Sequence, residues 1–295
     1  MTPAAGRPPE APPLPGRWRI RGGGIRLDRP VIMGVLNVTP DSFSDGGLFL
    51  EVDAAVARAE VLVEEGADLV DVGGESTRPG AAPVPLEEEW RRVGPVVERL
   101  AARSITVSVD TTKSEVARRA LEAGASVLND VSGLRFDSRM ADLAARHGAG
   151  LVVMHMRGDP ATMQRDVVYE DLIGEVRACL EGALRVAEER GCAPEQVVID
   201  PGIGFGKSVE GNLELLGRLD EFVALGRPIL IGPSRKSFVG RLLDVPTEER
   251  LEGTIAACVM ALERGARIFR VHDARPVRRA LDVAEAIRGT TVARE

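Results

Sequence analysis

The chain has 295 residues, 44% of them hydrophobic, which is enough to bury a large core in one domain of α/β-barrel size. Its formal net charge of −7 at pH 7 argues against a nucleic-acid partner, because a broad binding surface for nucleic acid must neutralise phosphates. The three cysteines lie far apart and no run approaches the roughly 20 apolar residues of a membrane helix, so we expect a cytoplasmic protein with reduced thiols and no membrane partner.

The N-terminal region divides into a tail and a hairpin. Residues 1–17 contain six prolines and no apolar run, so they do not resemble a signal peptide and are predicted to be a disordered tail. Residues 18–28 alternate apolar and charged side chains around three glycines, the pattern of a short β-hairpin. We therefore expect a single domain over residues 18–295.

From residue 31 onward, short apolar runs rich in β-branched residues alternate with segments of helical period. The eight runs cover residues 31–37, 68–73, 105–110, 126–130, 150–155, 196–200, 228–232 and 267–272. Between the first two runs, Val52, Val56, Ala59 and Val63 are predicted to share the buried face of one helix. Eight such repeats, with strands that are apolar throughout, favour a closed (β/α)8 TIM barrel, and a doubly wound open sheet is the alternative.

Polar residues stand at the ends of these predicted strands. In a TIM barrel the active site forms where the strands end and the following loops begin. The polar residues at these positions are Asn37, Asp71, Asp110, Asn129, Asp130, His155, Asp200, Arg270 and His272. We expect several of them to point into the mouth of the barrel.

Three of these residues suit the recognition of a heterocycle. Asp110, Asn129 and Asp200 end different strands, so a barrel would bring them to one ligand. A carboxylate accepts two hydrogen bonds side by side, which matches an amino group next to a ring N–H, and an asparagine adds a donor and an acceptor. Turn and cap chemistry explains any one of them alone. Three at equivalent positions favour a binding site.

The glycine-rich segment PGIGFGKS, residues 201–208, does not match a nucleotide motif. Pro201 stands where a phosphate-binding loop needs glycine, and Lys207 replaces the third glycine of a dinucleotide motif. We expect the segment to lie against the flat face of a ring, with Phe205 as an apolar wall.

The segment GPSRKSFVG, residues 232–240, follows a predicted strand and leads into a helix. Free backbone N–H groups at such a position attract anions. Only three of the 38 basic residues are lysines, namely Lys113, Lys207 and Lys236, and all three lie in motif segments. This loop is therefore predicted to be functional rather than merely solvated.

Two long polar loops, residues 37–47 and 73–81, follow the first two strands of the predicted barrel. Both contain proline and glycine, and loops of this kind after a barrel strand commonly close over a substrate. Near the end of the chain, Arg270 and His272 lie close together at a strand end and suit a polyanion.

The segments NVTPDSFSDGG, DVGGESTRPGA, SVDTTK, LNDVSG, DPGIGFGKS, GPSRKSF and RVHD together resemble the signature blocks of the dihydropteroate synthase family. They occur in the family's order and span residues 31–273. The resemblance implies a TIM barrel and a homodimer in the folate pathway. It also implies the condensation of a dihydropterin pyrophosphate with p-aminobenzoate and inhibition by sulfonamides.

The resemblance also implies roles for individual residues. Asp110, Asn129, Asp200 and Lys236 would bind the pterin edge, Arg270 would stack on its face, and Arg270 with His272 would contact the phosphates. Asn37 would hold a Mg²⁺ ion bound to the pyrophosphate. The p-aminobenzoate pocket would be formed by Phe43, Thr77, Arg78, Pro79, Phe205, Lys236 and Ser237, and Gly232 would line the same substrate site. Asn37, Lys236, Arg270 and His272 would serve the chemistry directly.

An aromatic amine is already neutral at pH 7, so the difficult step in such a condensation is the loss of pyrophosphate from a methylene carbon. We expect this departure to precede the attack of the amine. The alternatives are a pterin-binding methyltransferase domain of the corrinoid-dependent type, a pterin-binding barrel without turnover, and a sugar-phosphate barrel enzyme. A methyltransferase domain would not need the loops that contain STRPG and SRKSF, and both are present.

Overall fold

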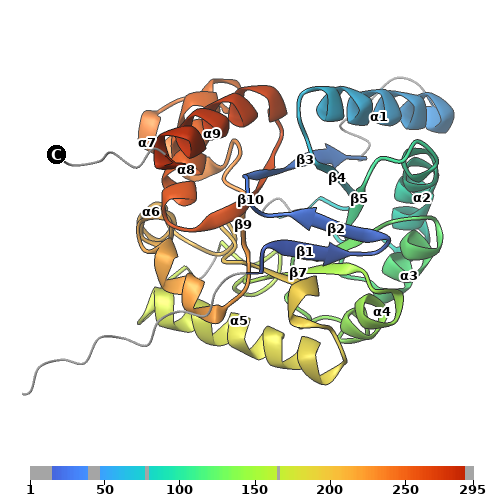
Figure 1. Ribbon diagram of the computed structural model, residues 1–295, viewed down its shortest axis with the longest axis horizontal. Coiled ribbons are helices and arrows are strands. Elements are labelled where there is room, and N and C mark those ends of the chain that lie inside the picture. Colours follow the sequence, from blue (N-terminus) through green and yellow to red (C-terminus); the bar gives the residue numbers. More distant parts are fainter. Residues whose placement is uncertain (1–14, 39–46, 77–79, 165–166, 290–295) are drawn as a thin grey trace, which may run out of the picture.

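The computed structural model of the chain describes residues 15–38, 47–76, 80–164 and 167–289. A two-stranded antiparallel hairpin precedes a closed barrel of eight parallel strands with helices around it (Figure 1). The predicted TIM barrel and N-terminal hairpin are thereby confirmed. The open-sheet alternative is wrong, because the last barrel strand pairs with the first and closes the ring. No helix in the described ranges is long and apolar enough to span a membrane.

The strands follow the predicted apolar runs. The hairpin consists of β1 (Arg17–Ile20) and β2 (Gly23–Arg26). The barrel strands are β3 (Val31–Asn37), β4 (Leu69–Gly73), β5 (Val107–Asp110), β6 (Val127–Asp130), β7 (Gly150–Met154), β8 (Val197–Asp200), β9 (Ile229–Ile231) and β10 (Ala266–Val271). Each overlaps one predicted run, because parallel strands covered on both faces are apolar along their whole length.

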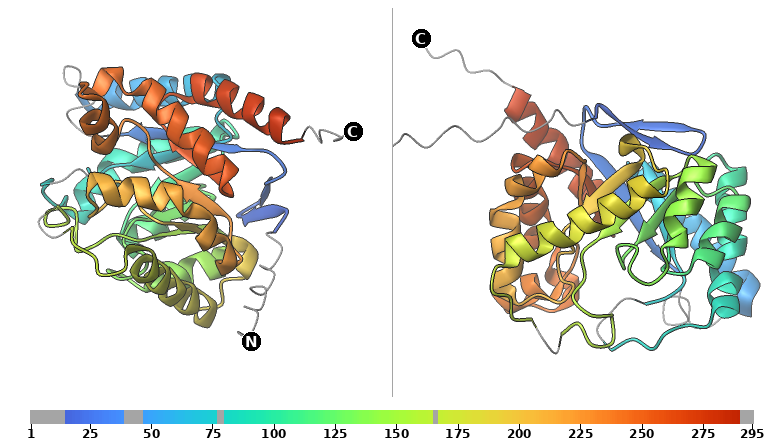
Figure 2. Two further views of the ribbon diagram at one scale, coloured as in Figure 1. Left: turned by 90° about the vertical axis from the view of Figure 1, so that its left-hand side faces the viewer. Right: turned by 90° about the horizontal axis from the view of Figure 1, so that it is seen from below.

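The helices cover the outside of the barrel (Figure 2). They are α1 (Gly47–Glu64), α2 (Leu86–Ala102), α3 (Ser114–Glu122), α4 (Arg139–His147), α5 (Leu172–Glu189), α6 (Val209–Gly217), α7 (Ser237–Leu243), α8 (Leu251–Glu263) and α9 (Ala274–Gly289).

One predicted helix face needs a correction. In α1, Val52, Val56 and Ala59 are buried as predicted, but Val63 is 38% exposed and Leu62 is buried in its place. The neighbouring strand explains this, because Gly34 of β3 leaves room for a large side chain. A Cβ atom at Gly34 would lie only 3.2 Å from Cδ1 of Leu62.

The hairpin covers the amino-terminal end of the barrel. Trp18 of β1 is fully buried among the side chains that fill the barrel interior, including Met33 and Leu69. Its indole Nε1 donates a hydrogen bond of 2.8 Å to the backbone oxygen of Gln196, just before β8. Because this end is covered by apolar packing, the carboxyl ends of the strands are left as the place for a substrate.

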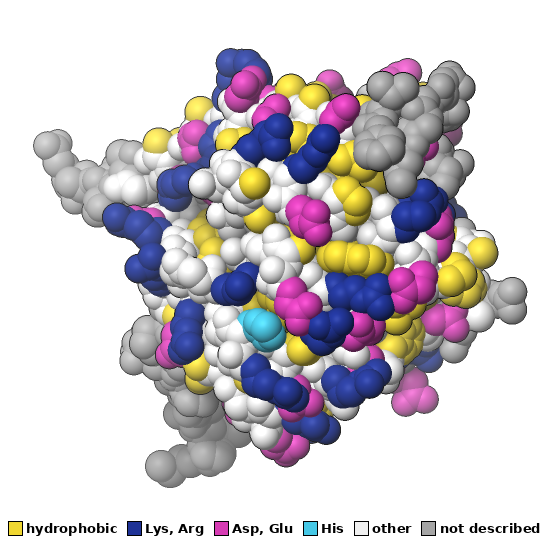
Figure 3. Space-filling model, turned by 90° about the vertical axis from the view of Figure 1, so that its right-hand side faces the viewer, with side chains coloured by type: hydrophobic (Ala, Val, Ile, Leu, Met, Phe, Trp, Pro, Cys, Tyr) yellow, Lys and Arg dark blue, Asp and Glu magenta, His cyan; other side chains and the backbone are white. Residues whose placement is uncertain are grey.

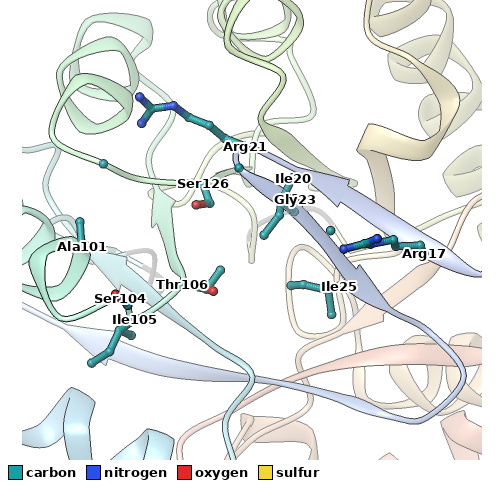
Figure 4. Close-up of a pocket in the computed structure, with 13 residues that line it drawn as sticks. Arg17, Ile20, Arg21, Gly23, Ile25, Ala101, Ser104, Ile105, Thr106 and Ser126 are labelled. Carbon is teal, nitrogen blue, oxygen red and sulfur yellow. The ribbon is translucent and has the colours of Figure 1, made fainter.

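A cavity of about 420 Å³ lies beside the hairpin (Figure 4). Its lining includes Arg21 of the hairpin turn, together with Ser104, Thr106 and Ser126 from the segments that lead into β5 and β6. The backbone N–H of Arg21 donates to the oxygen of Ser126 at 3.2 Å, which ties the turn to the barrel. This cavity is at the opposite end of the strands from the predicted site residues.

The face formed by α2 and α3 carries basic and acidic side chains in close alternation (Figure 3). Arg118 pairs with Glu115 at 2.7 Å, and Arg119 pairs with Glu87 on the neighbouring helix at 2.8 Å. Such exposed pairs contribute little stability individually. Among the described residues of this face, the acidic partners thus interrupt the basic side chains.

Candidate active site

Polar side chains gather where the barrel strands end. Asp110 ends β5, Asn129 and Asp130 end β6, and Asp200 ends β8, and all four side chains are buried. Arg270 lies near the end of β10, on the other side of the ring. The predicted convergence of distant strand ends is therefore present.

Arg270 connects strands that are not neighbours. Its Nε donates to Oδ2 of Asp71 at 2.7 Å, and its Nη2 donates to Oδ2 of Asp110 at 2.9 Å. The amide of Asn129 donates to the same Asp71 oxygen at 2.9 Å. The guanidinium group is thus held across the mouth of the barrel by two carboxylates.

Burial sets the charge state of the two predicted pterin-binding carboxyls. Burial raises the pKa of Asp110 to about 7, with Asp71 adding to this effect and Arg270 opposing it. Burial likewise raises the pKa of Asp200 to about 6, against the hydrogen bond from the Gly202 N–H and the nearby ammonium groups. Oδ1 of Asp200 accepts that hydrogen bond at 2.7 Å.

Lys236 reaches the site from the residue before α7. Its Nζ lies 3.9 Å from the centroid of the Phe205 ring, a cation–π distance. Burial lowers the pKa of Lys236 to about 8, Arg270 lowers it further, and Asp200 and Asp110 oppose the shift. Gly204 makes the approach of the two segments feasible, because it has φ +84° and a Cβ there would lie 2.8 Å from Cδ of Lys236.

His272 is fixed by Ser234. The Ser234 hydroxyl oxygen accepts the backbone N–H of His272 at 3.2 Å and lies 3.0 Å from Nδ1 of the same histidine. The hydroxyl can donate its proton to Nδ1 in the tautomer that carries the imidazole proton on Nε2. Burial lowers the pKa of His272 to about 4, and Arg270 adds to this shift. His272 is consequently a neutral hydrogen-bond donor at neutral pH.

The remaining described site residues lie around this cluster. Asn37 ends β3, and both its Oδ1 and Oδ2 of Asp110 lie within 4 Å of where a Cβ at Gly73 would stand. Gly232 follows β9 beside Arg270, whose Cβ would lie 3.7 Å from a Cβ at that glycine. Ser237 is exposed at the start of α7.

Four of the predicted p-aminobenzoate contacts, Phe43, Thr77, Arg78 and Pro79, lie outside the described residues.

The donor set fits Mg²⁺ only together with a phosphate ligand. Among the described residues, no three His, Cys, Asp or Glu side chains gather in a way that could hold a metal ion. Asn37 offers one amide oxygen, a hard ligand of the kind that Mg²⁺ accepts. Protein-bound Mg²⁺ commonly keeps several waters and completes its shell with substrate phosphates, so a single protein oxygen is compatible with such a site.

The sequence placed Asp71 among the polar strand-end residues, Ser234 in a loop predicted to be functional and Lys207 in a motif segment, but it gave none of the three an individual role. Asp71 is an acidic residue inside a strand that is otherwise apolar. Because a carboxylate buried in such a strand requires a cation nearby, this position could have predicted an ion pair. The individual roles of Ser234 and Lys207 could not be predicted, because their partners come from segments that are distant in the sequence.

Residues 33–272 match the pterin binding enzyme family. A dihydropteroate synthase from Synechocystis sp. is 46% identical over 278 residues, which cover 94% of this chain and 95% of the relative.

Two solved structures have the same fold. A dihydropteroate synthase from Xanthomonas albilineans with 4-aminobenzoic acid is 46% identical, with a TM-score of 0.87 over 93% of this chain and 99% of that one. The Thermus thermophilus enzyme in complex with 6HMPPP is 47% identical, with a TM-score of 0.82 over 92% and 99%. The chain therefore belongs to the dihydropteroate synthase family of pterin-binding enzymes.

Proposed function

We propose that this chain condenses (7,8-dihydropterin-6-yl)methyl diphosphate with p-aminobenzoate to give 7,8-dihydropteroate and pyrophosphate. The observation that carries the proposal is the cluster of Asp110, Asn129, Asp200, Lys236 and Arg270 at the carboxyl end of one barrel. The relatives whose structures contain 4-aminobenzoic acid and 6HMPPP support the choice of substrates.

The pterin would bind by its polar edge. Ionised Asp200 would accept hydrogen bonds from the amino group and the adjacent ring N–H on the pyrimidine side of the pterin. Asn129 and Asp110 would form hydrogen bonds with the remaining polar positions of the ring. Lys236 would donate to the ring oxygen or nitrogen between them, and Arg270 would stack on the ring face. These assignments are supported by the burial of the carboxyls, which strengthens hydrogen bonds to an uncharged heterocycle.

p-Aminobenzoate would lie against Phe205 and Lys236, with its carboxylate near Ser237. The start of α7 favours this orientation, because the first N–H groups of a helix attract negative charge. Phe43, Thr77, Arg78 and Pro79 would complete the pocket.

Arg270, His272 and Asn37 would serve the leaving group. Arg270 would stabilise the growing negative charge on the pyrophosphate, and neutral His272 would donate its Nε2 proton in a hydrogen bond to a phosphate oxygen. Asn37 would hold a Mg²⁺ ion that arrives with the pyrophosphate and supplies Lewis-acid stabilisation of the departing charge.

The reaction would proceed by departure first. The bond between the methylene carbon and oxygen breaks, its electron pair leaves with pyrophosphate, and the electron-rich dihydropterin stabilises the resulting cation. The neutral amine nitrogen then forms the new bond to carbon, and the proton that it loses passes to the released pyrophosphate. No strong base is required, so the protein's contribution is to position the two rings, exclude water and stabilise charge.

The deciding experiment is release of pyrophosphate by the purified protein. We expect release only when the dihydropterin diphosphate, p-aminobenzoate and Mg²⁺ are all present, and a sulfonamide to compete with p-aminobenzoate. Methyl transfer from a methylated folate to a corrinoid protein, without pyrophosphate release, would support the methyltransferase alternative.

A homodimer is supported by the exposed apolar side chains of two adjacent helices. Met260 of α8 is 51% exposed, and Val283 and Ile287 of α9 are 61% and 69% exposed. Large apolar residues gathered in this way favour an interface between subunits. Light scattering of the native protein should give twice the chain mass, and Ile287→Lys should shift it towards the monomer.

A cytoplasmic location is supported by the cysteines. Cys179, Cys192 and Cys258 are all free thiols. Thiols persist in the reducing cytoplasm, whereas extracellular compartments favour disulfides.

A further inference from the structure

Lys207 is a buried lysine to which the proposed reaction gives no role. Only 3% of it is exposed, although it carries an amine. Its Nζ lies 2.9 Å from each of three acceptors: Nδ1 of His155 and the backbone oxygens of Gly202 and Phe205. An ammonium has three protons to donate, so this shell satisfies it fully.

The segment before Lys207 is folded around this amine. Gly202, Gly204 and Gly206 have φ values of +74°, +84° and +67°, a region that favours glycine. A Cβ at Gly202 would lie 1.9 Å from the oxygen of His155, so no other residue fits there without movement of the backbone. This backbone conformation directs the carbonyl groups of Gly202 and Phe205 towards the protein interior. Buried carbonyl oxygens need a hydrogen-bond donor. Lys207 supplies it.

The same segment touches two proposed substrate-binding residues on its other side. The Gly202 N–H donates to Oδ1 of Asp200 at 2.7 Å, and the Phe205 ring lies under Nζ of Lys236 at 3.9 Å. The two residues whose carbonyl groups bind Lys207 are thus the same two that contact Asp200 and Lys236.

We propose that Lys207 is a positioning residue that fixes residues 201–206, so that Gly202 meets Asp200 and Phe205 meets Lys236. This inference rests on the proposed function and adds a residue that touches no substrate. It also accounts for a lysine in a chain whose basic residues are otherwise almost all arginine. A guanidinium group is planar and wider, and it would not fit a compact shell made for one ammonium.

The charges around Asp200 and Lys207 are consistent with this role. Asp200 faces the cationic groups of Lys207, Lys236 and Arg270, and each of them lowers the pKa of its carboxyl. Burial lowers the pKa of His155 to about 2, with Lys207 adding to the shift, so its ring is neutral, and Nδ1 can accept a proton of the Lys207 ammonium that it faces. Burial lowers the pKa of Lys207 to about 7 and Asp200 opposes this, so the two groups are electrostatically linked.

The test compares Lys207→Met and Lys207→Gln with a matched control, Gln196→Met. Gln196 is also buried, and its side chain donates to two backbone oxygens, those of Ala144 and Ala149. It directly precedes the amino-terminal end of β8, whereas Lys207 follows the carboxyl end of that strand. Lys207→Met and Gln196→Met each remove a buried donor, so both should lower thermal stability. Only loss of Lys207 should also alter the site.

In Lys207→Met we expect kcat/KM for the pterin substrate to fall about tenfold or more, because two buried carbonyls lose their donor and the segment relaxes. The pH midpoint of pterin binding should rise by about one unit, since Asp200 loses a positive neighbour. Lys207→Gln, which keeps a donor without the charge, should retain more activity than Lys207→Met. Gln196→Met should keep the wild-type kcat/KM and pH midpoint.

A measurement on the unaltered protein covers the case in which the variants do not fold. The chain has three lysines, so ¹³Cε-lysine labelling gives three NMR signals. Binding of the dihydropterin diphosphate should shift the Lys207 and Lys236 signals and leave Lys113 nearly unchanged.

A folded Lys207 variant with wild-type kcat/KM and pH midpoint would overturn the inference, and so would a Lys207 signal that is insensitive to pterin. If the wild-type protein releases no pyrophosphate with both substrates and Mg²⁺, the proposed function fails instead, and the two failures are distinguishable.

Discussion

Arg270 of β10 donates a hydrogen bond of 2.7 Å to Asp71 of β4, although 199 positions separate them in the chain. Asp71 is fully buried, so its carboxylate depends on this cation. Breaking a buried ion pair by removing one partner costs about 3–5 kcal/mol. We expect Asp71→Asn to lower the free energy of unfolding by that order, as measured by urea denaturation.

The same substitution should weaken pterin binding, because Arg270 loses one of the two carboxylates that orient it. Asp282→Asn is a suitable control, since Asp282 pairs with Arg278 at 3.5 Å on the surface and is 56% exposed. It should leave stability and binding nearly unchanged. An Asp71→Asn protein as stable as the control would show that Arg270 does not need this partner.

The buried titratable groups predict a bell-shaped pH profile. The pKa of Asp200 is about 6 and that of Asp110 about 7, both raised by burial, so their ionised forms are lost as the pH falls through this range. The pKa of Lys236 is lowered to about 8 by burial, so its positive charge is lost as the pH rises through that value. We expect kcat/KM for the pterin substrate to rise on the acid side and fall on the alkaline side accordingly.

Two variants assign the limbs of that profile. Lys236→Arg stays charged at all accessible pH values, so the alkaline limb should disappear from whatever activity remains. Asp200→Asn should lose most pterin binding and leave the remaining acid dependence to Asp110. An alkaline limb that persists in Lys236→Arg would mean that another group causes it, and Lys207, whose pKa burial lowers to about 7, is the candidate.

The barrel and its rim could be predicted from the sequence because both follow from local pattern. Eight apolar runs indicate strands covered on both faces, and the barrel geometry then brings Asp110, Asn129 and Asp200 to one end. The partners of these residues follow no local pattern. That Arg270 would reach Asp71 rather than solvent depends on how strands β10 and β4 are placed around the ring.

Other features depended on packing that no periodicity encodes. The hairpin was predicted, but its burial of Trp18 against the segment before β8 was not, because 178 residues separate Trp18 from Gln196. In α1, Leu62 rather than Val63 is buried because a glycine on the adjacent strand makes space for it. The shell around Lys207 likewise joins residues from the ends of β7 and β8.

Ser234 should control the proton position of His272. We expect the hydroxyl that lies 3.0 Å from Nδ1 to donate to this nitrogen and so to keep the imidazole proton on Nε2, where it can meet a phosphate. In Ser234→Ala we expect a mixture of tautomers and a fall in kcat of about tenfold, the order of one lost hydrogen bond in a charge-stabilising site. ¹⁵N NMR of labelled histidine reports the tautomer directly. Unchanged ¹⁵N shifts in this variant would show that Ser234 does not set the tautomer of His272.

Lys113 should hold the base of the loop that carries three proposed p-aminobenzoate contacts, Thr77, Arg78 and Pro79. It forms ion pairs with Glu75, two positions before Thr77, and with Glu89 of α2, whose side chain is 1% exposed. In Lys113→Met, Glu89 becomes a buried carboxylate without a cation, which costs about 3–5 kcal/mol of unfolding free energy. We also expect KM for p-aminobenzoate to rise, because Glu75 is released.

The loss of stability in Lys113→Met should depend on pH in a defined direction. Burial raises the pKa of Glu89, and removal of Lys113, which opposes that shift, raises it further. A carboxyl whose pKa is raised by folding favours the folded state at low pH and loses that advantage as the pH rises through the folded pKa. The deficit measured by urea denaturation should therefore grow from acidic to neutral pH. The double variant Lys113→Met, Glu89→Gln should recover most of it, and a deficit that is equal at all pH values would mean that the ionised Glu89 carboxylate is not its cause.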